Sequence, residues 1–260
     1  MVLQHSIFST DLSRATNMTK RSPVVPQDAE PGWPIRPLIP GSWRTLSLAD
    51  TCAVVGRLTS FEAENGISPL TASRVMFQRG RILALSALPG WALIELEAVL
   101  GSDETGYQAL LLGPGERLLV IDWTSRPVHQ AAAAALTWPP NDTQVAEYCY
   151  LFCNAMAGDG ERFRVVGSLE EVDLPASKRS RLFKDFNKGI SPFRIKRDKQ
   201  QVSASVTMVY RGDLFRAELQ LLPSGHVEMN GDTPICPAYV CREELHGSFR
   251  VIHAEPYAHS

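Results

Sequence analysis

Apolar and polar residues alternate most regularly near the C-terminal end of the chain. The alternation covers residues 202–210, 214–222 and 226–230, and short turn segments, Arg-Gly-Asp and Pro-Ser-Gly, separate the three runs. Successive side chains of a strand face opposite sides of a sheet, so a period of two favours strands with one buried face. The pattern predicts a three-stranded antiparallel meander. Its predicted inward-facing residues are Val202, Ala204, Val206, Met208, Tyr210, Phe215, Ala217, Leu219, Leu221, Val227 and Met229.

Short apolar runs broken by turn residues also dominate the first half of the chain. Such runs between turn signals predict strands. The last two predicted strands flank a Gly-Pro-Gly-Glu turn and therefore form a hairpin. The predicted strands cover residues 81–88, 91–100, 107–112 and 117–123.

Four further segments have helical features. Ser125 precedes a proline-containing first turn and a run of alanines, a combination typical of a capped helix. Another segment carries an apolar stripe at helical spacing, formed by Val145, Tyr148, Cys149, Phe152 and Met156. The predicted helices cover residues 68–78, 125–136, 143–157 and 177–188.

Strands and helices cluster separately, without β-α-β alternation, so the predicted fold class is α+β, with antiparallel β-meanders packed against a few helices. Trp138-Pro139-Pro140 marks the boundary between two halves of similar size, which form one domain or two. The predicted organisation is a disordered leader at 1–22, a proline-rich linker at 23–40, a β-rich α+β half at 41–138, an α+β half with the meander at 141–235, and a tail at 236–260.

Prolines recur at every third residue from Pro31 to Pro40, the period of a polyproline II helix. We expect the apolar side chains between them, Trp33, Ile35 and Leu38, to fasten this linker to the chain's own core. The alternative is that Pro-Gly-Trp-Pro-Ile-Arg is a ligand for an aromatic groove of another protein.

Five cysteines are an odd number and argue against a disulfide framework, which favours a reducing, cytoplasmic location. The first 22 residues lack the apolar run of a secretory signal, and no uninterrupted apolar stretch is long enough to span a membrane. The leader is rich in Ser and Thr with a single acidic residue, so secretion by a route other than Sec is the alternative. Either Met1 or Met18 is the start of the chain.

Charge is strongly segregated behind a formal net charge of -2. Residues 178–199 contain nine basic and two acidic residues, whereas residues 46–177 contain eight and sixteen. The cationic segment, defined as residues 178–199, begins with the predicted helix at 177–188. On that helix Leu182, Phe183 and Phe186 lie opposite the basic side, so it is amphipathic. The predicted binding residues are Lys178, Arg181, Lys184, Lys188, Arg194, Lys196 and Arg197.

A cationic ridge suits an acidic protein surface or a polyanion, including nucleic acid. Our leading hypothesis is therefore a non-catalytic interaction module that presents the cationic segment to such a partner. No RNA-binding signature, helix-turn-helix pattern or dinucleotide fingerprint accompanies it, and the sequence predicts no cofactor. The oligomeric state and the identity of the partner stay open.

Two other function classes are alternatives, so the sequence also leaves open whether the chain is an enzyme. A small hydrolase or transferase would use Cys149 or Ser125 as the nucleophile, with His129 as the base and Asp122 to orient it. The acid-poor leader and the linker are the basis of the other class, a secreted effector or its immunity partner.

A zinc site is the weakest alternative. Cys236, Cys241, His246 and His253 form a tetrahedral ligand set, but their spacing departs from that of structural zinc sites. The free cysteines Cys149 and Cys153, four residues apart, are predicted to pack in the core.

Overall fold

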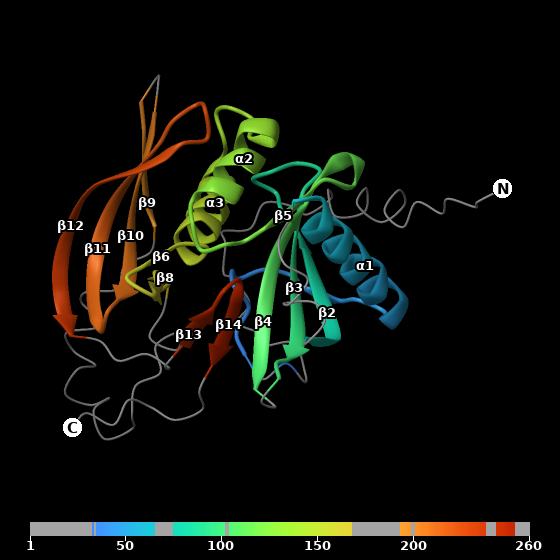
Figure 1. Cartoon of the computed structure of the whole chain (residues 1–260). Helices are drawn as coiled ribbons and strands as arrows, with labels where there is room; N and C mark the ends of the chain where they lie inside the picture. The colour runs from blue at the N-terminus through green and yellow to red at the C-terminus, as the bar shows by residue number, and fades with distance from the viewer. Residues whose placement is uncertain are drawn as a thin grey trace.

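The computed structural model describes residue 33 and residues 35–65, 75–101, 104–167, 193–198, 201–237 and 243–252. Within them the fold is α+β, with helices packed against antiparallel meander sheets, as the sequence predicts. Figure 1 shows a five-stranded sheet on one side, a seven-stranded sheet on the other, and helices α2 (Arg126–Ala135) and α3 (Asp142–Asn154) between them. The predicted helix at 177–188 lies outside the described residues.

The seven-stranded sheet combines the first half of the chain with its C-terminal strands. Its central meander, β2 to β4, is antiparallel, and the C-terminal pair β13 and β14 extends it because β14 pairs with β4. The strand order is β1 (Arg44–Thr45), β2 (Met76–Ala84), β3 (Ala92–Val99), β4 (Thr105–Leu112), β14 (Phe249–Ile252) and β13 (Glu243–His246), with β5 (Leu118–Val120) paired to β4 across a 3-10 turn at Pro114–Glu116.

Strand β2 corrects two predictions. Residues 76–78 were predicted as the end of a helix, and they are strand; the strand predicted at 81–88 begins at Met76 and ends at Ala84. The reason is pairing: β2 runs beside β3 from Ala84 opposite Ala92 to Met76 opposite Val99, with one irregularity between Phe77 and Arg79, so β3 provides backbone partners for residues 76–78 as well.

Helix α1 (Leu48–Glu64) was not predicted, and it covers the outer face of the seven-stranded sheet (Figure 1). Ser47 caps it by accepting a hydrogen bond from the Asp50 backbone N–H. Its buried positions are Thr51, Val54, Leu58 and Glu62. Only two of these four are apolar, so the helical period is hidden in the hydropathy pattern.

The five-stranded sheet contains the predicted meander, β10 (Val202–Tyr210), β11 (Asp213–Leu221) and β12 (Val227–Pro237), and on the other edge of β10 the short strands β8 (Arg164–Val165) and β9 (Arg194–Arg197). Nine of the predicted inward residues are buried and Tyr210 is half-buried, but Met229 is 49% exposed. Met229 lies on the edge strand β12, where it pairs with Leu219 next to a register shift between Glu218 and Leu219.

A single hydrophobic core joins the two sheets through α2 and α3. It includes residues of the seven-stranded sheet such as Leu93, residues of α3 such as Tyr148, and residues of the five-stranded sheet such as Leu219. The Tyr148 hydroxyl donates a 2.6 Å hydrogen bond to the Gly225 carbonyl in the turn before β12. Gly225 has φ +80° and a Cβ there would lie 2.6 Å from the Ala132 Cβ, so this close approach requires glycine. A two-stranded ribbon, β6 (Ala157–Gly158) and β7 (Glu161–Arg162), follows α3.

Candidate functional site

Strand β9, with the residue before it, presents Phe193 and Ile195 to one face of the five-stranded sheet, and Arg194 and Lys196 to the other. Phe193, just before the strand, and Ile195 pack against the core, whereas Arg194 and Lys196 are exposed on the outer face. This alternation follows from the strand period of two, and it places Arg194 and Lys196 together on the outer face, whereas Arg197 falls on the same face as Ile195.

Register places polar residues of the neighbouring strands beside these two cations. Ser205 of β10 lies opposite Arg194 and also opposite Glu218 of β11, and Ser203 lies opposite Lys196. Arg216 of β11 lies two residues from Glu218 and therefore on the same face, so three strands contribute to one polar patch.

These side chains enclose a cavity of about 160 Å³ on the outer face. Arg194, Lys196, Arg216 and Glu218 give its lining a formal charge of +2. Ser205, only 9% exposed, and the half-buried Ser203 add hydroxyl groups. Guanidinium, ammonium and hydroxyl groups are all donors, so the arrangement suits an anionic ligand. We call it the cationic pocket; its residues are Arg194, Lys196, Ser203, Ser205, Arg216 and Glu218.

The cationic pocket lies where the chain rejoins the sheet at β9, inside the C-terminal part of the cationic segment. Strands β8 and β9 pair with the same edge of β10, β8 at Val209 and Met208 and β9 from Ser205 to Val202. Both are antiparallel to β10, so they form one edge strand that the chain leaves after β8 and rejoins at β9. The Val166 N–H donates to the Thr207 carbonyl, which brings the departure point next to Arg194.

Of the predicted binding residues, Arg194 and Lys196 line the cationic pocket. Arg197 has a different environment, because its guanidinium forms an ion pair with Asp142 and donates to the Pro140 carbonyl near the start of α3. The other predicted binding residues, Lys178, Arg181, Lys184 and Lys188, lie outside the described residues. Sequence reasoning missed Arg216, Ser203 and Ser205, which join the pocket only through strand register.

The structure does not bring the alternative catalytic residues together. Cys149 is 1% exposed in the core, where desolvation raises the pKa of its thiol to about 12, and the pKa of Cys153 is also raised by burial. The free, buried state of both cysteines confirms their prediction as core residues. Burial of this kind opposes formation of the thiolate that nucleophilic catalysis needs.

His129 and Asp122 have other partners. His129 Nε2 accepts a 3.4 Å hydrogen bond from the Val227 N–H, and its ring lies against Phe152 and His226; burial and the nearby His226 lower its pKa. Asp122 accepts from Thr124 and Arg126 at the start of α2. Within the described part of the chain, no side-chain hydrogen bond or ion pair joins His129 to Asp122, Cys149 or Ser125.

Ser125 occupies the N-cap position of α2, but its side chain makes no capping hydrogen bond. The Thr124 hydroxyl accepts from the Arg126 N–H instead, at 3.4 Å. Ser125 is therefore the N-cap residue, as predicted, but the side-chain acceptor at this helix start comes from Thr124.

The predicted zinc ligands are only partly described. Cys236 lies on β12 of the five-stranded sheet, and His246 lies on β13 of the seven-stranded sheet beside Glu104 and Glu244. Cys241 and His253 lie outside the described residues. Among the residues that are described, no group of three or more His, Cys, Asp or Glu side chains could bind a metal ion.

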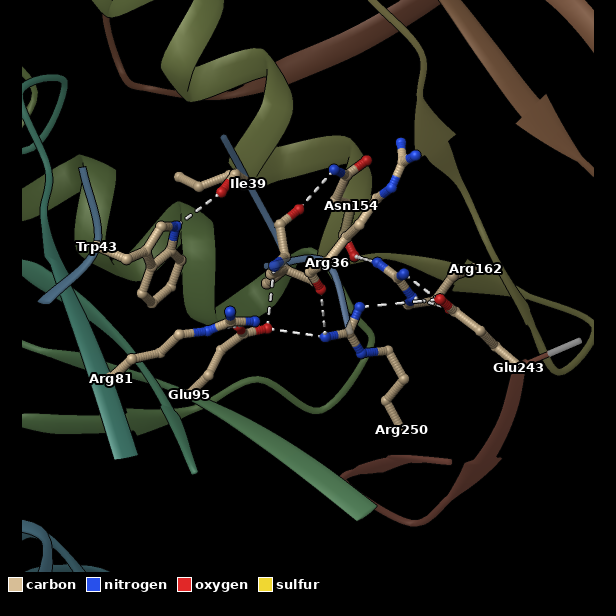
Figure 2. Close-up of polar contacts among 10 residues, drawn as sticks. Arg36, Ile39, Trp43, Arg81, Glu95, Asn154, Arg162, Glu243 and Arg250 are labelled. Carbon is tan, nitrogen blue, oxygen red and sulfur yellow. Dashed lines mark hydrogen bonds and ion pairs between the residues drawn. The ribbon is translucent and has the colours of Figure 1, made fainter. Parts of the chain in front are cut away.

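A buried ion network is a further polar cluster among the described residues; it is formed by Arg81, Glu95, Arg162, Glu243 and Arg250 (Figure 2). Glu95 is 1% exposed and accepts from Arg81 Nε at 2.7 Å and from Arg250 Nη2 at 2.9 Å. Arg250 continues to Glu243, which also pairs with Arg162. Burial would raise the pKa of Glu243, but the attraction of Arg162 and Arg250 outweighs it and lowers that pKa to about 2.

The network fastens the proline-rich linker to the sheet. Glu95 accepts from the Leu38 N–H at 3.0 Å, and Asn154 Nδ2 donates to the Leu38 carbonyl at 2.6 Å. Trp33, Ile35 and Leu38 are buried, which confirms the predicted packing of the linker's apolar side chains. Figure 2 shows this part of the chain between α3 and the Arg81–Glu95 pair, so the network stabilises the fold of the chain itself.

None of the helices in the described ranges combines the length and apolarity that crossing a membrane requires. Comparison of the chain with protein-family models, with curated proteins and with solved structures finds no match.

Proposed function

We propose that this chain is a non-catalytic interaction module that binds an acidic protein surface or another polyanion through the cationic segment and the cationic pocket, which shares Arg194 and Lys196 with that segment. The observation that carries the proposal is the pocket itself. Arg194, Lys196 and Arg216 come from two strands and enclose one cavity with a formal charge of +2, on the face of the sheet opposite the core.

Charge distribution supports the proposal. The cationic segment contains nine of the chain's 26 basic residues and two of its 28 acidic residues, which leaves 17 basic and 26 acidic residues elsewhere. An anionic partner is therefore attracted to one region and repelled by the rest of the chain. Such segregation orients an encounter and raises its rate, most strongly at low ionic strength.

The environments of the alternative catalytic residues favour binding over catalysis. Cys149 is buried with a raised pKa, and His129 accepts its hydrogen bond from a backbone N–H. Free thiols at Cys52, Cys149 and Cys153 are compatible with a reducing compartment, and a cytoplasmic location is part of this proposal.

The test is binding of polyglutamate, and in parallel of a single-stranded oligonucleotide, as a function of salt concentration. We expect affinity to fall steeply with salt, because the cationic segment releases counterions when it binds a polyanion. Replacing Lys178, Arg181, Lys184 and Lys188 with Glu should abolish binding to both probes. Arg194→Glu with Lys196→Glu should weaken it by about tenfold or more, the effect of losing a few charge-assisted hydrogen bonds.

A matched control has the same change in formal charge at a distant surface. Arg44 on β1 and Arg126 at the start of α2 are both exposed, and Arg44→Glu with Arg126→Glu should leave affinity within about threefold. Binding that is indifferent to salt, or equally weakened by the control pair, contradicts the proposal.

A further inference from the structure

We infer that the cationic pocket binds one phosphate monoester group, so that the module recognises phosphorylated partners in preference to merely acidic ones. This inference rests on the proposed function and specifies the ligand of the same site. Two observations support it: the charge of the pocket lining matches that of a phosphate monoester, and its hydrogen-bond donors match the phosphate oxygens.

The charge of the lining equals that of a phosphate monoester. Three cationic side chains and Glu218 give +2, and a phosphate monoester carries about -1.5 to -2 at neutral pH. A carboxylate or a phosphodiester carries only -1 and would leave a cationic excess in the pocket. Coulomb energy in a partly desolvated cavity is several times larger than in water, so this difference separates the ligand classes.

The donors are also more numerous than a carboxylate can use. Two guanidinium groups, one ammonium group and the hydroxyls of Ser203 and Ser205 all face one cavity. A carboxylate presents two oxygens, whereas a phosphate monoester presents three terminal oxygens, each a strong acceptor. Arginine's planar fork is suited to bidentate contacts with phosphate, and two arginines are available, on the two strands that flank β10.

Backbone pairing fixes much of this arrangement before a ligand arrives. Ser205 lies opposite Arg194 and Glu218, and Ser203 lies opposite Lys196, within a continuous antiparallel ladder. Serine has a single rotatable bond before its hydroxyl, so little conformational entropy is lost when these donors engage an oxygen. The long cationic side chains then close on the ligand from the neighbouring strands.

Glu218 has a selective role. Its carboxylate reduces the lining charge from +3 to +2, and it repels anions generally. It also supplies an acceptor for an N–H or O–H group of the molecule that bears the phosphate. Removing its charge is therefore expected to strengthen binding of every anion and to reduce the preference for the monoester.

The test uses a phosphoserine peptide, the same peptide with Ser at that position, and the same peptide with Glu. We expect the phosphopeptide to bind the full chain at least about tenfold more tightly than the Glu peptide, and inorganic phosphate to compete with it. Affinity should fall below about pH 6, where the phosphate dianion takes up one proton and becomes a monoanion. A Glu peptide has no such step near pH 6.

Pocket variants identify the site. Arg194→Gln and Ser205→Ala should remove most of the phosphopeptide preference, and Glu218→Gln should tighten the Glu peptide more than the phosphopeptide. Arg44→Gln, the matched control on β1, should change neither affinity. Circular dichroism of each variant separates a loss of binding from a loss of fold.

Three outcomes overturn the inference: equal binding of the phosphopeptide and the Glu peptide, a preference that survives Arg194→Gln, or monoester-dependent binding only of a 5′-phosphorylated oligonucleotide. Other outcomes distinguish a failure of the proposed function from a failure of the phosphate inference. If polyglutamate and the oligonucleotide do not bind but the phosphopeptide does, the pocket stands and the polyanion module is wrong. If the polyanions bind in a salt-dependent way without any monoester preference, only the pocket assignment is wrong.

Discussion

The buried ion network and the cationic pocket both contain several arginines, but their charges are balanced in different ways. In the network, Glu95 and Glu243 lie between Arg81, Arg162 and Arg250, and these side chains are nearly inaccessible to solvent. In the pocket, three cations share the single carboxylate of Glu218 and open onto the surface.

The comparison separates an architectural use of charge from a use in recognition. Buried ions are tolerated only where partners compensate for the lost hydration, so the network requires each of its members. Surface cations keep much of their hydration and need no partner for the fold. Variants in the network should therefore change stability, and variants in the pocket should change binding.

The largest expected effect comes from Glu95→Ala. The variant leaves Arg81 and Arg250 buried without their shared carboxylate, and it removes the acceptor of the Leu38 N–H. We expect the free energy of unfolding to fall by about 3 to 5 kcal/mol, measured by urea denaturation. Glu218→Ala is the surface control and should shift it by less than about 0.5 kcal/mol. Equal effects of the two variants would erase the distinction between the clusters.

The second largest effect is expected at low pH, where protonation of Glu243 weakens the buried ion network. The folded-state pKa of Glu243 is about 2 against an ordinary 4.5, so its contribution is fully present above pH 4.5 and is lost as pH falls toward 2. We expect a loss of about 2 to 3 kcal/mol over this window, read from urea denaturation at successive pH values. Glu243→Gln should be less stable at pH 7 and have a flatter profile below pH 4.5. If Glu243→Gln kept the wild-type dependence of unfolding free energy on pH, and Glu218→Gln lost it, Glu243 would not be the group responsible.

Asn154→Ala tests the link between the network and the linker. Asn154 donates to the Leu38 carbonyl and accepts from the Val165 N–H, so the variant leaves two buried backbone groups without these hydrogen bonds. We expect destabilisation of about 2 kcal/mol, with faster amide hydrogen exchange at Leu38 and Val165. Asn230→Ala, on the exposed edge strand β12, is the control and should have little effect.

Local patterns explain which parts of the fold were predictable. Strand β10 was predicted with its observed bounds, because Val202 to Tyr210 alternates without interruption between two turns. Helix α1 was missed because Thr51 and Glu62 occupy buried positions and dilute its apolar stripe. The available signal was Ser47 followed three residues later by Asp50, a pattern typical of an N-terminal cap.

Long-range pairing explains what could not be predicted about the two clusters. Charge segregation identified Arg194 and Lys196, but Arg216 joins them only through the register of β10 with β9 and β11. The network left no local signal at all. Glu95 alternates with apolar residues as a solvent-facing residue does, and its partner Arg250 lies at the other end of the chain.

The smallest effect on stability is expected from Arg194→Gln in the cationic pocket. Arg194→Gln removes an exposed cation beside Lys196, so relief of their mutual repulsion offsets whatever packing the Arg194 side chain loses. We expect the free energy of unfolding to change by less than about 0.5 kcal/mol, and the small change to shrink further at high salt because salt screens surface charges. Urea denaturation of Arg194→Gln and Lys196→Gln at two salt concentrations measures it. A loss above about 1 kcal/mol would show that the pocket cations, like those of the buried network, are part of the architecture.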